Sequence, residues 1–253
     1  MEKNNQIKSI KRAIDVLECF LASESLSFNE ICKKTNLSHG TVYRIINTLI
    51  NRNFITKDYK SDKYIIGKGV FILGLFALKN YEFEKIVHPA LEELALNTKE
   101  TANASIFYDN SIIFVDSVKS SYSVKMDVKI GQRTFINSSA SGKAILSYFE
   151  QEKIDEILKN SSLPKLTVNS ITDKEQFKKE LEIVRRKGFA LDNEEEEIGL
   201  KCVGGPVFNY KGSVEGAISI SGPTSRIDQN LEIFINYVKK TCSDVSSKLG
   251  YFQ

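Results

Sequence analysis

Between Ser27 and Leu49 the sequence carries two short helical patterns separated by a tight turn, and this arrangement constrains the fold more than any other feature. The first pattern opens with Ser27-Phe-Asn-Glu30, an S-x-x-E capping box that predicts a helix ending at about Thr35. The segment Asn36-Leu-Ser38 supplies the turn, and Ser38 is expected to cap the helix that follows. This order of elements predicts a helix-turn-helix.

An amphipathic helix is predicted before this pair. Apolar residues recur at three- and four-residue spacing up to about Ala22, and we expect the helix to pack in the core through Ile10, Ala13, Ile14, Leu17 and Leu21. Such a helix would support the two that follow it.

The third helix of this unit has an apolar face and a polar face. Val42, Ile45, Ile46 and Leu49 form the apolar stripe, which must pack on the first two helices. The opposite face is rich in hydrogen-bond donors, and a helix N-terminus also favours phosphate. Because base edges in the major groove present distinct donor and acceptor patterns, we expect DNA contacts from Ser38, His39, Gly40, Thr41, Tyr43, Arg44 and Asn47. A small helical bundle without a nucleic-acid partner is the alternative.

Two β-prone runs follow, Phe54–Thr56 and Lys63–Ile66, and they predict a hairpin wing. We expect phosphate contacts from the basic residues of the first helix and of the wing, which are Lys8, Lys11, Arg12, Lys57, Lys60 and Lys63. For the wing lysines, plain solvation of a charged hairpin tip is the alternative. The charge balance agrees, since residues 1–70 hold 12 Lys and Arg against 7 Asp and Glu, whereas the remainder holds 23 against 25.

The length of the chain, 253 residues, favours two domains, each large enough to bury its own core. No apolar run approaches the roughly 18 residues that span a bilayer, and residues 1–12 lack the apolar core of a secretory signal, so we expect a cytoplasmic protein without a membrane partner. The four cysteines form no CxxC pair, which argues against a disulfide framework and a zinc-finger cluster.

Residues 67–80 predict a helix that is apolar on two sides. Val70, Leu73, Gly74 and Ala77 lie on one side, and Phe71, Leu75 and Leu78 lie on the other. A helix of this kind needs two packing partners, which either a second subunit or the interior of a monomer would provide.

The remainder of the chain mixes helical and strand patterns. Helices are predicted at Ile86–Leu96, Ala144–Phe149, Lys153–Leu158 and Gln176–Lys187. Strands are predicted at Ala104–Phe107, Ile112–Val118, Val124–Val128, Cys202–Phe208 and Val214–Ser221. This mixture predicts an α+β domain.

The reactive residues argue against an enzyme. Neither histidine, His39 or His88, has an evident nucleophile partner, and Cys202 would need a nearby base and an electropositive setting to act as a thiolate. Ser141-Gly-Lys143 lacks the other residues of a phosphate-binding loop. The acidic run Glu194–Glu197 indicates a solvated turn rather than a metal site. We therefore expect no catalytic residue, cofactor or metal.

A set of short motifs extends over nearly the whole chain. They are Ser9–Leu17, Leu37–Ile45, Tyr64–Gly67, Pro89–Leu94, Ser139–Ala144, Gly188–Glu195, Cys202–Gly204, Val207–Asn209 and Ile218–Pro223. In order and spacing they resemble the IclR family of bacterial transcriptional regulators. The chain departs from that pattern at Ser38 and His39, where Pro-Lys is frequent, and at Phe135–Asn137, where Pro-Leu-His is commoner.

The resemblance implies a winged helix-turn-helix at residues 1–68, a linker helix at 69–82 and a GAF-like effector domain at 83–253. In that family the linker helix helps to join two subunits, so a homodimer or a dimer of dimers is expected. The implied function is transcriptional regulation, with repression expected, in which a small organic acid modulates binding to operator DNA. A sensor or enzyme that retains the N-terminal domain without binding DNA is the alternative.

The resemblance also implies an effector pocket. It maps onto the backbone amides near Ala140 and Ser141 and onto the side chains of Asp192, Cys202, Ser219 and Ser221, as in members that bind small 2-oxo acids. A helix start with hydroxyl and thiol donors can hold a carboxylate without a cation. Structural roles are the alternative: the serines as strand residues, Asp192 as the cap of a turn and Cys202 as a small buried residue.

Overall fold

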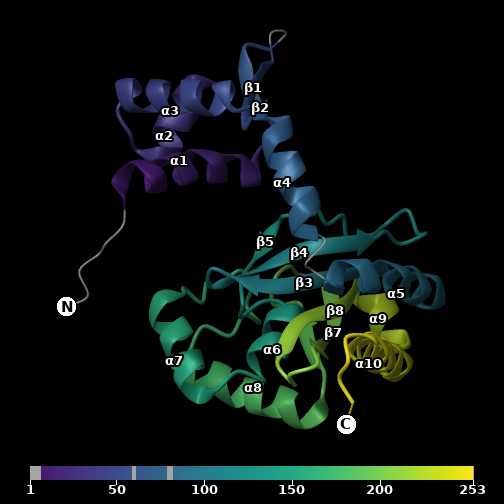
Figure 1. Ribbon diagram of the computed structural model, residues 1–253. Coiled ribbons are helices and arrows are strands. Elements are labelled where there is room, and N and C mark those ends of the chain that lie inside the picture. Colours follow the sequence, from purple (N-terminus) through teal and green to yellow (C-terminus); the bar gives the residue numbers. More distant parts are fainter. Residues whose placement is uncertain (1–6, 59–60, 79–81, 253) are drawn as a thin grey trace. The chain divides into compact units, whose positions relative to one another are not determined.

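The chain divides into two units, residues 1–81 and 82–253, in the computed structural model (Figure 1). The structure describes residues 7–58, 61–78 and 82–252. Each unit buries an apolar core of its own. The first contains the helix-turn-helix with its hairpin wing and the second a mixed helix and sheet domain, so the predicted α+β class is confirmed.

Three helices build the core of the N-terminal unit: α1 (Lys8–Glu18), α2 (Phe28–Thr35) and α3 (His39–Asn51), with a 3-10 turn η1 (Cys19–Ala22) after α1. The predicted capping box opens α2, because the Ser27 hydroxyl accepts from the Glu30 amide at 3.3 Å and the Glu30 carboxylate accepts from the Ser27 amide at 2.7 Å. Asn36 ends α2 with a left-handed φ of 54°, which makes the predicted turn.

The predicted apolar face of α1 is wrong. Ile10, Ile14 and Leu21 are about half exposed or more, at 55%, 48% and 55%, whereas Val16 and Phe20 enter the core. Ala13 and Leu17 are half-buried between the two faces. Helix α1 carries two adjacent apolar stripes, and α2 and α3 cover the one that contains Val16.

The wing consists of β1 (Ile55–Asp58) and β2 (Lys63–Ile66), paired antiparallel as predicted. A bridge between Leu26 and Tyr64 fastens it to the helices. Helix α4 (Lys68–Leu78) follows and confirms that most of residues 67–80 is helical, while residues 79 and 80 lie outside the described residues. It carries a run of exposed large apolar side chains: Phe71, Ile72, Leu73, Leu75 and Phe76.

One antiparallel sheet organises the second unit. Its strands are β3 (Thr101–Tyr108), β4 (Ser111–Val118), β5 (Arg133–Thr134), β6 (Ala190–Asn193), β7 (Leu200–Phe208) and β8 (Val214–Pro223). They lie in the order β5-β4-β3-β8-β7-β6, so β8 from late in the chain pairs with β3, the first strand of the unit (Figure 1). The short strands β5 and β6 were not predicted.

Helices cover both faces of this sheet. Helices α5 (Glu82–Thr98) and α10 (Leu231–Lys248) pack on one face around Val87, Leu91, Ile218, Ile220 and Val238. Helices α6 (Ala140–Leu146), α7 (Gln151–Asn160) and α8 (Lys174–Lys187) form a second core on the other face. The short α9 (Thr224–Gln229) leads into α10, and neither of these was predicted.

One predicted strand is wrong, and one predicted helix is shifted along the chain. Val124–Val128 is not a strand but part of a loop, whose backbone carbonyls are tied to Thr101 and Arg226. Helix α6 begins four residues before the predicted start at Ala144 and ends at Leu146. It begins early because the Ser139 hydroxyl accepts from the Gly142 amide at 3.0 Å and caps it.

Candidate DNA-binding face and effector site

The polar face of α3 is open to solvent. Ser38, His39, Gly40, Tyr43, Arg44 and Asn47 are exposed, and Thr41 is half-buried. Val42, Ile46 and Leu49 are buried on the opposite side and Ile45 is half-buried, as the predicted stripe requires. The seven residues predicted to contact DNA therefore share the surface of one helix and its N-cap.

Ser38 does not cap α3 in the predicted way. It occupies the N-cap position, but its side chain accepts no backbone N–H. Its hydroxyl instead lies 2.9 Å from the hydroxyl of Thr41. Both hydroxyls remain at the start of α3, where they add donors to the exposed face.

The ring of His39 stacks on Phe28 at the start of α2, with centroids 5.7 Å apart and planes at 27°. The residue that departs from the family pattern is thus fixed against the preceding helix. The residue as a whole remains exposed.

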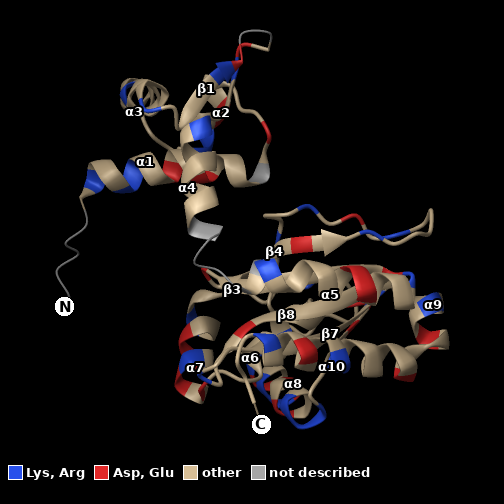
Figure 2. Ribbon diagram, turned by 45° about the vertical axis from the view of Figure 1, so that its right-hand side comes forward, with Lys and Arg blue, Asp and Glu red and all other residues tan. Residues whose placement is uncertain are grey.

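A groove of about 360 Å³ runs between α1 and α3. Arg12 from α1 and Arg44 and Thr41 from α3 line it, together with Ser9, Ala13, Ile45, Thr48 and Leu49. Further Lys and Arg residues lie along α1, which is partly blue in Figure 2. Arg44, predicted to contact bases, therefore shares a groove with Arg12, predicted to contact a phosphate.

The wing lysines differ in their surroundings. Lys57 forms an ion pair of 2.5 Å with Asp62 and lies over the Tyr64 ring. Lys63 is half-buried on β2, and Lys60 lies outside the described residues. Of the three wing lysines predicted to reach phosphate, Lys57 already has a carboxylate partner.

The six residues predicted for the effector pocket come together on one face of the sheet. Strand pairing places Asp192 of β6 beside Cys202 of β7, and Cys202 beside Ser221 of β8. Ser219 lies two residues earlier on β8, and α6 packs its first residues, Ala140 and Ser141, against β7 and β8.

Hydroxyl groups connect these residues to neighbours that sequence reasoning missed. Ser105 donates to Ser141 at 2.9 Å, and Ser141 donates to Ser219 at 3.3 Å. Asn103 donates its amide to Ser221 at 3.2 Å. Both Asn103 and Ser105 are buried. Ser105 lies in the predicted strand Ala104–Phe107 and Asn103 directly precedes it, so the two polar residues alternate with apolar ones. This alternation is the sequence signal that could have identified them.

The site is closed in this structure. Ala140, Ser141, Asp192, Ser219 and Ser221 are at most 3% exposed, and Cys202 is 7% exposed. Gly204 of β7 permits the tight approach of α6, since a Cβ there would lie 3.2 Å from the Ser141 nitrogen and 3.0 Å from the Ala140 carbonyl carbon. A ligand can therefore reach these groups only if the packing over them opens.

The thiol of Cys202 is unsuited to nucleophilic catalysis. Burial raises its pKa well above the usual value, and the Asp192 carboxylate raises it further. The thiol approaches Asp192 Oδ2 at 3.5 Å. A reactive cysteine needs the opposite setting, one that lowers the thiol pKa.

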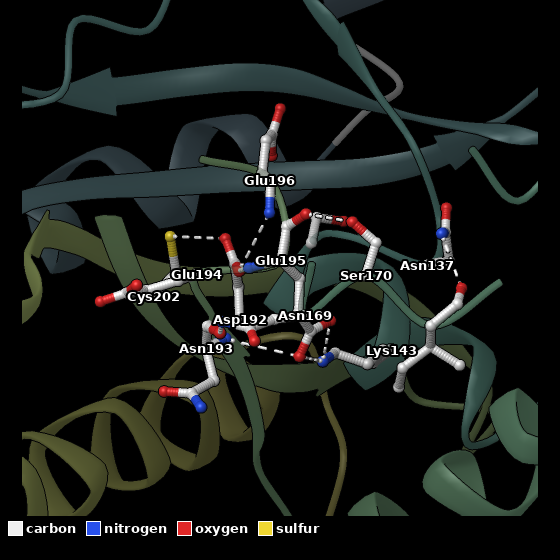
Figure 3. Close-up of polar contacts among 12 residues, drawn as sticks. Asn137, Lys143, Asn169, Ser170, Asp192, Asn193, Glu194, Glu195, Glu196 and Cys202 are labelled. Carbon is white, nitrogen blue, oxygen red and sulfur yellow. Dashed lines mark hydrogen bonds and ion pairs between the residues drawn. The ribbon is translucent and has the colours of Figure 1, made fainter. Parts of the chain in front are cut away.

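Asp192 caps a turn, which was the structural role considered for it as an alternative to ligand binding. Its Oδ1 accepts from the Glu195 amide at 2.8 Å and from the Glu196 amide at 3.4 Å (Figure 3). Burial raises the pKa of this carboxyl to about 7, even though the amide bond from Glu195 lowers it. The group therefore titrates near neutral pH.

The predicted solvated acidic turn is wrong, because only Glu197 of its four glutamates is exposed. Glu195 is 6% exposed, and both its carboxylate oxygens lie 2.6 Å from the ammonium group of Lys143, which is fully buried (Figure 3). Glu196 is half-buried and accepts from Thr134 at 2.9 Å. A backbone turn closed by Asp192 directs these side chains inward. The pairing of Lys143 with Glu195 could not be predicted from the sequence, because the two residues are 52 positions apart.

Within the described residues, no group of three or more His, Cys, Asp or Glu side chains is arranged to hold a metal ion. The helices among residues 7–58, 61–78 and 82–252 include none that is long and apolar enough to cross a membrane.

Comparison with known proteins covers both units. The model of the IclR helix-turn-helix domain matches residues 9–58, and that of the bacterial transcriptional regulator IclR C-terminal matches residues 75–247. The HTH-type transcriptional regulator KdgR of Dickeya chrysanthemi is 29% identical over 98% of this chain and 81% of its own length. The transcriptional repressor IclR of Escherichia coli is 28% identical over 97% of this chain and 91% of its own.

Solved structures agree. The IclR of Thermotoga maritima is 30% identical, with a TM-score of 0.72 over 97% of this chain and all of that one. An IclR homolog of Microbacterium hydrocarbonoxydans complexed with 4-hydroxybenzoate has a TM-score of 0.83 over 95% of this chain and 98% of that one, but is 19% identical and supports the fold alone.

The family models account for most of both units, one as a DNA-binding head and the other as an effector-binding domain. These are the modules of a regulator and not of an enzyme. The chain belongs to the IclR family of DNA-binding transcriptional regulators.

Proposed function

We propose that this regulator is a homodimeric repressor whose binding to a pseudo-palindromic operator is modulated by a small carboxylate effector. The observation that carries the proposal is the gathering of Asp192, Cys202, Ser219 and Ser221 on one sheet face beside the start of α6. In the division that we propose, residues 1–68 bind DNA, 69–82 link the domains and 83–253 bind the effector. Repression is supported by the relative from Escherichia coli, which is named a repressor.

In this proposal the exposed face of α3 enters the major groove. His39, Gly40, Tyr43 and Asn47 face base edges, with Ser38 and Thr41 at the helix start. Lys8, Lys11 and Arg12 contact flanking phosphates. Arg44 lies between the base-contacting and the phosphate-contacting residues, because it is exposed on α3 and also lines the groove that contains Arg12.

Selection of bound sequences from a random DNA pool tests the DNA function directly. With the selected operator, Arg44→Ala costs about 1–3 kcal/mol of binding free energy and relaxes sequence preference if Arg44 contacts a base. If it contacts a phosphate, the loss is uniform across sequences and the salt slope falls by about one. Arg186→Ala, an exposed arginine of α8, is the matched control. Failure to retain any DNA sequence selectively would refute the proposed function.

The proposed effector interacts through a carboxylate. The backbone N–H groups at the start of α6, the hydroxyls of Ser219 and Ser221 and the thiol of Cys202 supply donors without a free cation. We test this with a thermal-shift panel of pyruvate, glyoxylate and 4-hydroxybenzoate. Ser219→Ala combined with Ser221→Ala should abolish the shift, whereas Ser243→Ala on the exposed side of α10 should leave it unchanged. A shift that survives the double substitution would exclude these serines.

The proposed dimer forms through α4, whose exposed Phe71, Ile72, Leu73 and Leu75 provide an apolar surface. Effector binding then changes the spacing of two DNA-binding heads. This requires an effector that binds the two arrangements with different affinity. Sedimentation of Phe71→Ser against the wild type tests the interface, and an unchanged dimer would exclude α4.

A further inference from the structure

The buried charges beside the effector site are unbalanced. Within the described residues of this cluster, Asp192, Glu195 and Glu196 contribute three carboxyl groups, whereas Lys143 contributes the single ammonium group. Both oxygens of Glu195 lie 2.6 Å from Lys143. The positive charge is therefore already neutralised by one carboxylate before any ligand arrives.

Asp192 is held by neutral groups. Its Oδ1 accepts from the amides of Glu195 and Glu196, and its Oδ2 lies 3.5 Å from the thiol of Cys202. The side chain is fully buried. Two N–H groups stabilise an ionised carboxylate only in part when water is excluded, and burial accordingly raises the pKa of Asp192 to about 7.

Each element packed against β6 presents an ionisable side chain to Asp192. Helix α6 presents Lys143, strand β7 presents the Cys202 thiol, and the turn after β6 presents Glu195 and Glu196. Lys201, the neighbour of Cys202, points to the opposite face of β7, where it pairs with Asp228 at 2.5 Å. The surroundings of Asp192 thus carry more negative than positive charge.

An anionic ligand would add another negative charge to this closed space. The hydroxyls of Ser219 and Ser221 can donate hydrogen bonds to it, but they carry no charge. Like charges that share a dry site cannot all stay ionised, and the group with the weakest charge compensation takes up a proton. Here that group is Asp192, since Glu195 has Lys143 and Glu196 is half-buried with Thr134 as donor.

We infer that the carboxylate effector binds together with one proton, which Asp192 takes from solvent onto Oδ2 as the ligand enters. No covalent bond of the ligand forms or breaks. The inference rests on the proposed carboxylate function of this site. It makes the regulator respond jointly to effector and to pH: acid favours the bound state, and alkaline conditions weaken it.

Isothermal titration calorimetry of the full chain with pyruvate, glyoxylate and 4-hydroxybenzoate in two buffers of different ionisation heat counts the protons taken up. We expect close to one proton for each ligand bound at about pH 8 and far fewer at about pH 6, with affinity roughly tenfold weaker at the higher pH. Asp192→Asn keeps the shape and the Oδ1 acceptor but cannot titrate, so its affinity should not change with pH. Asp173→Asn, an exposed capping aspartate of α8, should retain the wild-type pH dependence.

Different results would overturn the proton uptake by Asp192 and the carboxylate effector. Binding of any of the three acids with equal affinity at both pH values and no proton uptake overturns the inference and leaves the carboxylate effector intact. Absence of binding by all three acids at both pH values overturns the carboxylate effector, and the inference with it. If Asp192→Asn does not fold, the proton count of the wild type decides alone.

Discussion

The ammonium nitrogen of Lys143 lies 2.6 Å from both carboxylate oxygens of Glu195, and the two residues are 52 positions apart in the chain. The pair joins α6 to the turn after β6, so it links the two elements that frame the proposed effector site. Thr167 and Ser170 hold the same turn by donating to the carbonyls of Glu194 and Glu195, each at 2.7 Å.

Removal of one partner from this buried pair should be costly. Lys143→Met leaves the Glu195 carboxylate buried without its cation, and we expect a loss of about 3–5 kcal/mol in the free energy of unfolding. Lys143→Met combined with Glu195→Leu replaces both charges and should recover most of that loss. Denaturant unfolding of the three proteins measures both effects. A single variant that loses less than about 1 kcal/mol would show that the pair behaves like an exposed one.

The raised pKa of Asp192 predicts how stability depends on pH. The pKa is 3.8 for an ordinary aspartate and about 7 in the folded protein, so between these values the folded state holds a proton that the unfolded state releases. The stability from this group is complete below about pH 4 and is lost as the pH rises to about 7.

Asp192→Asn should remove that dependence. Relative to the wild type, we expect the melting temperature of the variant to improve steadily from about pH 4 to about pH 7 and then to change no further. Asp173→Asn serves as the control for loss of an exposed carboxylate. Parallel curves for wild type and Asp192→Asn across this range would contradict a raised pKa at Asp192.

Local signals made the N-terminal unit predictable. The Ser27–Glu30 capping box and the stripe from Val42 to Leu49 depend on residues near one another in sequence. The same periodicity failed on α1, where the stripe through Ile10 and Ile14 and the one through Val16 and Phe20 are both apolar. Packing with α2 and α3 decides between them, and spacing within α1 carries no information about that contact.

The residues predicted for the effector pocket do lie together, but the charges around them were not predictable from the sequence. Family motifs marked Asp192 and Cys202, whereas the burial of Glu195 depends on Lys143 from a distant helix. Similarly, the alternation in Val124–Val128 indicated a strand, but its backbone is tied to Thr101 and Arg226. Hydrogen bonds and ion pairs between residues far apart in the chain produce no periodic pattern in the sequence.

The two serines at the helix starts should differ in their effect on stability. Ser27→Ala removes a complete capping box and should cost about 1 kcal/mol of unfolding free energy. Ser38→Ala removes only the hydroxyl contact with Thr41 and should cost a few tenths of that value. Hydrogen exchange of the α2 and α3 amides distinguishes the two variants. Equal losses would mean that Ser38 caps α3 in solution.

Gly67, at the junction of β2 and α4, should tolerate no side chain. Its amide donates to the Phe54 carbonyl at 2.8 Å, and a Cβ on it would overlap the backbone carbonyl of Asn53. Gly67→Ala must therefore displace the chain where it leaves the wing, at a cost of about 1–3 kcal/mol. Gly74→Ala is the matched control, because a Cβ at this position of α4 meets no atom within 4 Å, and alanine favours a helix over glycine by about 1 kcal/mol.

Hydrogen exchange should rise in α3 and β1 of Gly67→Ala and stay unchanged in β7 and β8, while Gly74→Ala leaves α3 and β1 as in the wild type. Unchanged exchange in Gly67→Ala would mean that the junction yields at no cost and does not fix the start of α4.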